Sequence, residues 1–242
     1  MKRGVILAGG TGSRLAPLTN ITNKHLLPVY DRPMIYYPIQ SLLQCRIKEI
    51  LIVTGGSSSS EIMRLLGSGH SFGCHFEYAY QDTNGGIADA LRLAYAFADH
   101  DKIMVMLGDN IFMESIEFFM NQFEFTWGTQ VLLTKVPDPK NYGVPILEND
   151  KITKIVEKPE QPVCDLAVTG CYFYDFSVFD VIETLKPSKR GELEISDVNN
   201  EYARQNMLQH AVYDGIWIDC GASHDHLLDA GLKIRNHKQG KQ

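Results

Sequence analysis

Short apolar runs alternate with segments of helical periodicity along the first half of this chain. Strands are predicted by the apolar runs at 4–8, 49–54, 75–80 and 103–107. Helices are predicted near 33–45, 59–67, 87–98 and 114–125, the second of them opened by a Ser58/Glu61 capping box. Strands that are apolar throughout are typical of a sheet buried on both faces. The alternation therefore predicts an α/β fold with a Rossmann-like, mostly parallel sheet flanked by helices.

The pattern changes past residue 128. Closely spaced strands, bounded by turn residues, are predicted at 130–136, 142–147, 151–157 and 168–174. They indicate an antiparallel subregion built from hairpins. Helices near 176–185 and 195–205, a strand at 209–218 and a last helix from about 224 complete the chain. Neither a repeat nor a linker interrupts it, so we expect one domain over 1–242 with two halves, about 1–128 and about 129–242.

Composition narrows the classes of protein to consider. The net charge of −6 disfavours a broad nucleic-acid-binding surface. No apolar run approaches the roughly 20 residues of a membrane span, and a strand begins too soon after Met1 for a signal peptide. The five cysteines are odd in number and form no CxxC pair, which indicates reduced thiols in a cytoplasmic protein.

The glycine-rich turn after the first strand carries the strongest functional signal. Gly9, Gly10 and Gly12 follow the apolar run and lack the Cβ atoms that would block a ligand from the backbone. Such a loop can direct several N–H groups at a phosphate chain. Arg14 and Lys24 add positive charge where anionic oxygens would lie. We therefore expect a phosphate-binding loop.

Two commoner phosphate motifs are excluded by the same residues. The chain contains no G-x-x-x-x-G-K-[ST] string, so it has no Walker P-loop. A dinucleotide-binding fingerprint needs a third glycine where Leu15 stands, and an acidic residue at the end of the next strand, which here ends in 54–56, Thr-Gly-Gly. A nicotinamide-dependent oxidoreductase is therefore disfavoured.

Further motifs follow in order along the chain. Asp109 ends a buried strand, where ligands of open α/β sheets bind, so it is placed to hold a divalent cation against phosphates. The motifs are Gly108-Asp109-Asn110, Glu157-Lys158-Pro159, Val168-Thr169-Gly170, Arg190-Gly191-Glu192-Leu193-Glu194 and Trp217-Ile218-Asp219. Together with the glycine loop, they resemble the sugar-phosphate nucleotidyltransferases from Met1 to about Gly231.

The resemblance implies a nucleotidyltransferase or glycosyltransferase-A-like fold, with nucleotide bound by the first half and sugar phosphate by the second. It implies an Mg2+-dependent transfer from a nucleoside triphosphate to a sugar 1-phosphate, and it is strongest to members that use dTTP and glucose 1-phosphate. Longer members carry a helical tail that contributes a regulatory nucleotide site and subunit contacts. This chain stops at Gln242, so we expect neither by that route, and a homo-oligomer of another kind is left open.

The resemblance also assigns residues to roles. Arg14, Lys24 and Asp109 would be catalytic, and Asp109 and Asp219 would hold the metal. The nucleotide would be bound by Leu7, Ala8, Gly9, Gly10, Thr11, Gly12, Gln81 and Gly86. The sugar phosphate would be bound by Asn110, Tyr142, Gly143, Glu157, Lys158, Val168, Thr169 and Glu192. A glutamine carboxamide offers a donor and an acceptor, which suits a thymine or uracil edge.

The chain departs from the family pattern at several positions. Asp89 stands where many members carry Gln, and a solvated first-turn acid favoured by the helix dipole accounts for it as well as a ligand contact does. His25 replaces a Gln, and a catalytic role is disfavoured because the attacking phosphate is already an anion. Pro145 follows Val144 where the family has Val-Val, which puts the strand near Gly143 in doubt. The 220–226 segment is one residue longer than usual, and its two histidines diverge on a helix, which disfavours zinc.

Three alternatives stay open on the sequence. The nearest is a sister transferase that uses UTP, such as a glucose-1-phosphate uridylyltransferase, or another sugar 1-phosphate. The second is a non-catalytic sugar-nucleotide sensor, which the joint presence of Arg14, Lys24, Asp109 and Asp219 disfavours. The third is the oxidoreductase already set aside.

Overall fold

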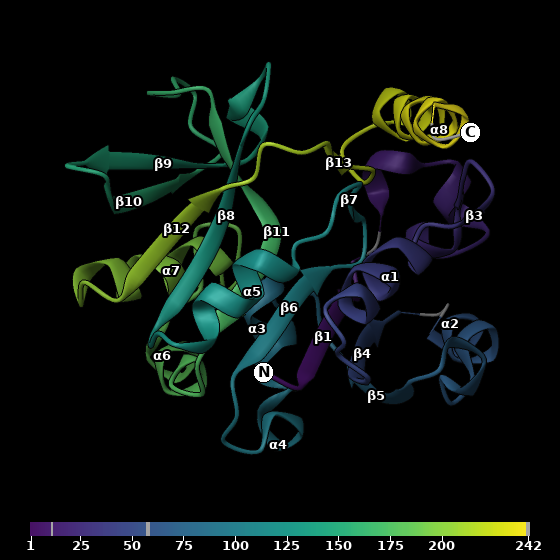
Figure 1. Cartoon of the computed structure of the whole chain (residues 1–242), viewed down its shortest axis with the longest axis horizontal. Coiled ribbons are helices and arrows are strands. Elements are labelled where there is room, and N and C mark those ends of the chain that lie inside the picture. Colours follow the sequence, from purple (N-terminus) through teal and green to yellow (C-terminus); the bar gives the residue numbers. More distant parts are fainter. Residues whose placement is uncertain (11, 57–58, 241–242) are drawn as a thin grey trace.

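A seven-stranded sheet forms the centre of the protein. The computed structural model describes residues 1–10, 12–56 and 59–240. The strand order is β12-β8-β11-β6-β1-β4-β5. The bounds are β1 (Arg3–Ala8), β4 (Glu49–Gly55), β5 (His75–Gln81), β6 (Ile103–Leu107), β8 (Thr129–Lys135), β11 (Leu166–Tyr174) and β12 (Leu208–Val212). Within this sheet β1, β4, β5 and β6 run parallel, β11 is antiparallel to both β6 and β8, and β12 is parallel to β8 (Figure 1). The predicted mostly parallel sheet is confirmed.

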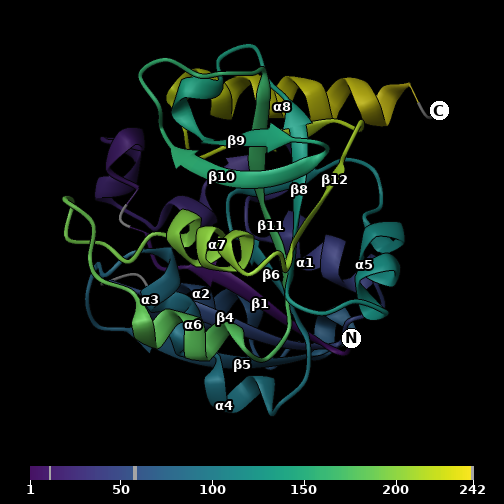
Figure 2. The same cartoon turned by 90° about the vertical axis from the view of Figure 1, so that its left-hand side faces the viewer.

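Helices cover both faces of the sheet because its strands are apolar on both. In β1, Val5 and Leu7 pack into one buried cluster, and Ile6 and Ala8 pack into the other. The first cluster includes residues of α3 (Ile87–Arg92), α6 (Val178–Thr184) and α7 (Ile195–Arg204). The second includes residues of α1 (Tyr36–Gln44), α2 (Ser59–Leu66) and α5 (Glu117–Glu124). Figure 2 shows α6 and α7 on one side of the sheet and α1 and α5 on the other.

Three two-stranded pieces complete the β structure. They are the antiparallel hairpin of β9 (Gly143–Glu148) and β10 (Lys151–Glu157), the pair β7 (Asn110–Phe112) with β13 (Trp217–Asp219), and β2 (Pro28–Val29) with β3 (Arg32–Pro33). A third apolar cluster joins Ile111 of β7 and Ile218 of β13 to Ala230 and Ile234 of α8 (His224–Gln239). The short 3₁₀ turns are η1 (Ser13–Leu15), η2 (Leu18–Asn20), η3 (Lys24–Leu26), η4 (His70–Phe72) and η5 (Pro139–Asn141).

Two predicted elements are divided in the structure. The strand expected at 209–218 is wrong: it ends at Val212, and β13 begins at Trp217 in a different sheet. The chain turns there because the Glu114 carboxylate accepts hydrogen bonds from the Tyr213 hydroxyl (2.9 Å) and from the N–H of Ile216 (2.8 Å). The helix expected at 87–98 is also wrong as one piece, since α3 stops at Arg92 and α4 (Tyr95–Ala98) follows after a tighter turn.

The other predicted strands and helices are confirmed to within a few residues, whereas β2, β3 and β7 were not expected. Ser58 of the expected capping box lies outside the described residues. In the part of the chain that the structure describes, no helix has the length and apolar character needed to cross a bilayer.

Candidate functional site

A cavity of about 750 Å3 opens where β1 and β6 end, and both halves of the chain line it. Most of the residues predicted for the site line this cavity together. They are Leu7, Gly9, Gly10, Arg14, Lys24, Gln81, Gly86, Asp109, Asn110, Tyr142, Gly143, Glu157, Lys158, Val168, Glu192 and Asp219.

Three predicted residues do not line it. Ala8 is fully buried because its side chain points into the apolar cluster under α1 and α2. Gly12 precedes η1 in the left-handed conformation (φ 67°), and its Cβ position faces the side chains of Thr19 and Lys24. Thr169 is fully buried, and its hydroxyl has no hydrogen-bond partner among the residues that the structure describes. Thr11 lies outside the described residues.

Two carboxylates lie next to each other at the end of the sheet. Asp109 immediately precedes β7, and Asp219 ends β13, where it pairs with Asn110. The carbonyl of Asp109 accepts a hydrogen bond from the N–H of Cys220 (3.0 Å), and the Asp219 carboxylate accepts one from the N–H of Gly221 (3.0 Å). A Cβ on Gly221 would collide with Asp109 Oδ2, so only glycine leaves room for this arrangement.

Lys24 neutralises one of the two carboxylates. Its Nζ lies 2.5 Å from Asp109 Oδ2, and both side chains are mostly buried. Burial alone would raise the pKa of Asp109, but the surrounding groups together, with Lys24 foremost and a hydrogen bond from Asn110, outweigh burial and hold that pKa well below its usual range. Burial, and then repulsion by Asp109, raises the pKa of Asp219 to about 6. The pair therefore keeps an excess of negative charge that a further cation would offset.

The donor set fits a magnesium ion that arrives with phosphates. Mg2+ prefers oxygen ligands and is usually bound by one or two carboxylates, with phosphate oxygens and water completing the shell. Asp109 and Asp219 supply two carboxylates beside the glycine loop. Over residues 1–10, 12–56 and 59–240, no group of three or more His, Cys, Asp or Glu side chains forms a separate metal cage.

Asn110, the first residue of β7, connects β11 and β13 beside the two carboxylates. Its Oδ1 accepts hydrogen bonds from the N–H of Gly170 in β11 (2.8 Å) and from the indole N–H of Trp217 in β13 (2.7 Å). Its amide donates to Asp109 Oδ1 at 3.1 Å. Asn110 was predicted to bind sugar phosphate, but most of its hydrogen-bonding capacity is used within the protein.

His25 is buried beneath the site and neutral. Asn23 Oδ1 accepts from the backbone N–H of His25 (2.9 Å), so it also accepts from the ring Nδ1 at 2.7 Å. Burial, and after it the charge of Lys24, lowers the pKa of His25 to about 3. The ring thus donates to Asn23, the residue that caps the start of η3, and it also contributes to the wall of the cavity.

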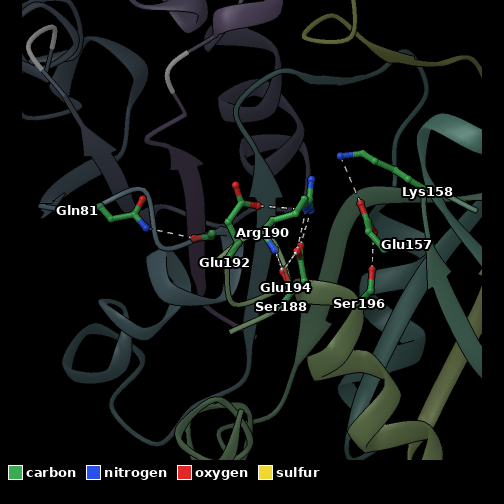
Figure 3. A network of polar contacts seen from close by, with 9 residues as sticks. Gln81, Glu157, Lys158, Ser188, Arg190, Glu192, Glu194 and Ser196 are labelled. Atoms are coloured by element: carbon green, nitrogen blue, oxygen red, sulfur yellow. Dashed lines mark hydrogen bonds and ion pairs between the residues drawn. The ribbon is translucent and has the colours of Figure 1, made fainter. Parts of the chain in front are cut away.

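One end of the cavity is formed by Gln81 and the turn that follows it. Gln81 Nε2 donates to the carbonyl of Gly86 (3.2 Å) and to Asp89 Oδ2 (2.8 Å). Gly86 has φ 97°, and a Cβ there would stand 2.6 Å from the carbonyl of Leu193. Asp89 is buried, which corrects the expectation of a solvated first-turn acid. Figure 3 shows Gln81 on one side of Arg190 and Lys158 on the other.

The opposite end is formed by Lys158 and Glu157 at the end of β10. Lys158 lies 3.7 Å from Glu157 Oε1, and the Ser196 hydroxyl donates to Glu157 Oε2 at 2.6 Å (Figure 3). Lys158 has a positive φ of 45°, a strained conformation for a lysine, and Pro159 follows it. Local backbone strain of this kind is common at ligand sites. Pro145 lacks the N–H that a strand residue would donate across the hairpin. The backbone N–H and carbonyl of Ile155, which lies opposite Pro145, are instead hydrogen-bonded to the side chain of Asn200.

Several lining residues were not assigned a role from the sequence. Arg190 is the most notable, because its guanidinium pairs with Glu194 (2.7 Å) and Glu192 (3.5 Å) in the lining of the cavity (Figure 3). Arg190 lies in one of the motifs that carry the family resemblance, so the sequence could have indicated it. The same holds for Gly170, Glu194 and Trp217. The remaining lining residues carry no sequence signal of their own: Ser13, Asn84, Ile87, Ala90, Leu107, Asn141, Tyr172 and Ile195.

The fold and the site define a class of protein. A mostly parallel sheet ends in a glycine loop, two carboxylates and two cations, and the cavity extends from there into the second half. Such an arrangement is typical of α/β proteins that bind phosphorylated ligands beyond the ends of their strands.

Comparisons with known proteins agree with this class. Residues 3–237 match the family model for nucleotidyl transferases, and the chain belongs to that family. A glucose-1-phosphate thymidylyltransferase of Neisseria meningitidis serogroup A is 41% identical over 96% of this chain and 82% of its own length. One from Mycolicibacterium smegmatis is 40% identical over the same shares.

Solved structures show the same fold. A candidate glucose-1-phosphate thymidylyltransferase from Bacillus anthracis, in complex with sucrose, superposes with a TM-score of 0.93 at 47% identity, over 97% of this chain and 96% of that one. A UDP-glucose pyrophosphorylase complexed with UDP-glucose superposes with a TM-score of 0.84 at 24% identity, over 98% and 99% of the chains, and shares the fold.

The neutral burial of His25 predicts a pH-dependent stability. Its pKa of about 3 in the folded protein lies below the ~6.5 of an exposed histidine. The unfolded chain therefore takes up a proton below pH ~6.5 that the folded protein refuses, and the free energy of unfolding falls by up to about 1.4 kcal/mol per pH unit. In His25→Asn, whose amide can replace Nδ1 as donor, this contribution is lost. Urea unfolding at pH 7.5 and pH 5 should show the stability difference between wild type and variant shrinking by about 2 kcal/mol at the lower pH.

Titration of Asp219 is common to both proteins and cancels in that comparison. A difference between wild type and His25→Asn that stays constant with pH would contradict the neutral, buried state of the ring.

Proposed function

We propose that this protein transfers the deoxythymidylyl group of dTTP to α-D-glucose 1-phosphate, giving dTDP-glucose and pyrophosphate. One observation carries the proposal. A single cavity is lined by Gln81 and Gly86, which would bind the base, and by Lys158 and Glu157, which would bind the sugar phosphate. Arg14, Lys24 and two carboxylates line the same cavity. Relatives about 40% identical that are named for this activity support the choice of substrates.

The reaction needs positioning and charge more than covalent help. An oxygen of the sugar phosphate attacks the α-phosphorus of dTTP and forms the new P–O bond. The bond to the bridging oxygen breaks in line with it, and its electron pair leaves with pyrophosphate. No general base is required, because the attacking oxygen is already anionic. Aligning the two phosphates and stabilising developing charge supply most of the catalysis.

The residues of this chain divide that work. The backbone of Gly9 and Gly10 would bind the triphosphate closely, and Arg14 would stabilise the charge on the departing pyrophosphate. Lys24 would neutralise oxygens near the reacting phosphorus. Lys158, turned into the cavity by its backbone conformation, would hold the incoming phosphate, and Glu157 would accept from sugar hydroxyls.

Asp109 and Asp219 would hold Mg2+ in this proposal. When bound, the ion neutralises phosphate oxygens and draws electron density from the α-phosphorus. The pKa of Asp219, raised by burial and then by the negative charge of Asp109, supports this assignment.

Pyrophosphate release with a panel of nucleotides tests the proposal. With glucose 1-phosphate and Mg2+, kcat/KM should be highest for dTTP. UTP should follow, because one methyl group in an apolar pocket discriminates by only about 10–200-fold. CTP, ATP and GTP should be lower by on the order of 10⁴, since hydrogen-bond mismatch discriminates more strongly. Omitting the sugar phosphate is the control. A preference for UTP would assign the sister activity, and no pyrophosphate with any nucleotide would indicate a sensor.

Substitution of the carboxylates should abolish most turnover without unfolding the protein. Asp109→Asn and Asp219→Asn should each reduce kcat by about 10²–10³, because a neutral amide cannot offset the cation beside the triphosphate. Calorimetric titration of dTTP with and without Mg2+ should show that the variants lose the metal-dependent part of binding. Asp150→Asn, a change at an exposed acid remote from the cavity, is the matched control. Near-normal turnover of either variant at limiting Mg2+ would remove that residue from the metal site.

Arg14 and Lys158 should fail in different ways. Arg14→Ala should lower kcat, because its charge acts on the leaving group. Lys158→Ala should raise the KM for glucose 1-phosphate by about tenfold or more, as expected for a lost charged hydrogen bond, with a smaller change for dTTP. Lys151→Ala, at an exposed lysine on the same strand as Glu157, is the control. If Lys158→Ala changed only the KM for dTTP, its placement on the sugar side would be wrong.

A further inference from the structure

We propose that Asp89 is a positioning residue that fixes the orientation of the Gln81 carboxamide and thereby selects the base. It leaves Gln81 with only an acceptor to offer, which admits thymine and uracil and rejects cytosine. The inference rests on the proposed function, since it concerns the same nucleotide.

Asp89 is held in one place by its neighbours. It lies in the first turn of α3 and is only 8% exposed. Its Oδ2 accepts from Gln81 Nε2 at 2.8 Å, and its Oδ1 accepts from the Arg92 guanidinium at 2.7 Å, one helical turn later. A Cβ on Gly85 would stand 2.5 Å from Asp89 Oδ2, so the turn in front of the carboxylate is packed closely.

The chemistry of a carboxylate removes the usual ambiguity of a glutamine side chain. An ionised carboxylate only accepts hydrogen bonds, so the amide nitrogen of Gln81 must face Asp89. The carbonyl of Gly86 accepts from the same nitrogen at 3.2 Å. Both N–H groups of the carboxamide are therefore used inside the protein. Gln81 Oε1 is left, 2.9 Å from where a Cβ of Gly9 would stand, beside the glycine loop that lines the cavity.

A lone acceptor discriminates between pyrimidines by their N3 atom. Thymine and uracil carry a hydrogen on N3 and can donate it to Gln81 Oε1. Cytosine presents a bare N3 lone pair at the same place, which repels the oxygen. Flipping the amide would satisfy cytosine, but it would turn Oε1 toward both Asp89 and the Gly86 carbonyl. The sequence predicted that Gln81 offers the base both a donor and an acceptor, whereas in this arrangement it offers only an acceptor.

The variant Asp89→Asn tests this inference. An asparagine can offer either an oxygen or a nitrogen to Gln81, so only the Gly86 carbonyl still opposes the flip. The kcat/KM ratio of dTTP to CTP should fall by about tenfold, the contribution of a charged hydrogen bond. Part of that fall should be a gain for CTP, which a merely structural role of Asp89 would not produce. Asp180→Asn, the same change at an exposed first-turn acid of α6, should leave the ratio unchanged.

An unchanged ratio in Asp89→Asn, or a parallel loss for dTTP and CTP, would overturn the inference. Failure of the proposed function is distinguishable, because wild type would then show no preference for dTTP in the first place. If Asp89→Asn does not fold, NMR of the wild-type protein without nucleotide decides. Both Gln81 side-chain amide protons should exchange with water more slowly than those of the exposed Gln161, and equal exchange rates would refute their engagement by Asp89 and Gly86.

Discussion

The proximity of two carboxylates, Asp109 buried and Asp219 half-buried, is the constraint on which the site depends. Such a pair is costly unless its charge is offset and its oxygens are hydrogen-bonded. Lys24 offsets Asp109, and the backbone of Gly221 donates to Asp219. Asn110 then ties this corner to β11 and β13 through the N–H of Gly170 and the indole of Trp217. The strands, the loop carrying Lys24 and the last turn before α8 are therefore all held in position by the same few polar contacts.

The loop before α7 is hydrogen-bonded to the turn that follows Gln81. The backbone of Leu193, in the loop before α7, accepts from the N–H of Ala88 (3.2 Å) and donates to the carbonyl of Gly85 (2.7 Å). The loop that carries Arg190 and Glu192 thus forms a wall of the end where Gln81 lies. One segment therefore holds the turn that follows Gln81 and also carries the charged side chains of Arg190 and Glu192 into the cavity lining. A shift of that segment would change both.

Sequence reasoning identified the strands, the glycine loop and the acidic positions because each has a local signal: apolar runs, absent Cβ atoms, and charged residues at strand ends. It could not find what depends on contacts between distant segments. From the sequence Asp89 is expected at the surface, and its hydrogen bond with Gln81, eight residues earlier in the chain, has no local signal. The end of β12 before residues 213–216 depends on Glu114, about a hundred residues away. The burial of Thr169 depends on the position of β11 between β6 and β8. The fold class was accessible from pattern alone, whereas the use of individual polar atoms was not.

The position of β11 has a consequence for how the molecule can be divided. Although it comes from the second half of the chain, it hydrogen-bonds β6 of the first half on one edge and β8 on the other. A fragment ending near residue 128 would therefore leave β6 as an open edge strand. That strand is apolar on both faces, with Ile103, Met104, Val105 and Met106 fully buried in the intact protein. Unpaired, flat and apolar edges recruit strands from other molecules, so such a fragment would aggregate rather than persist as a nucleotide-binding module.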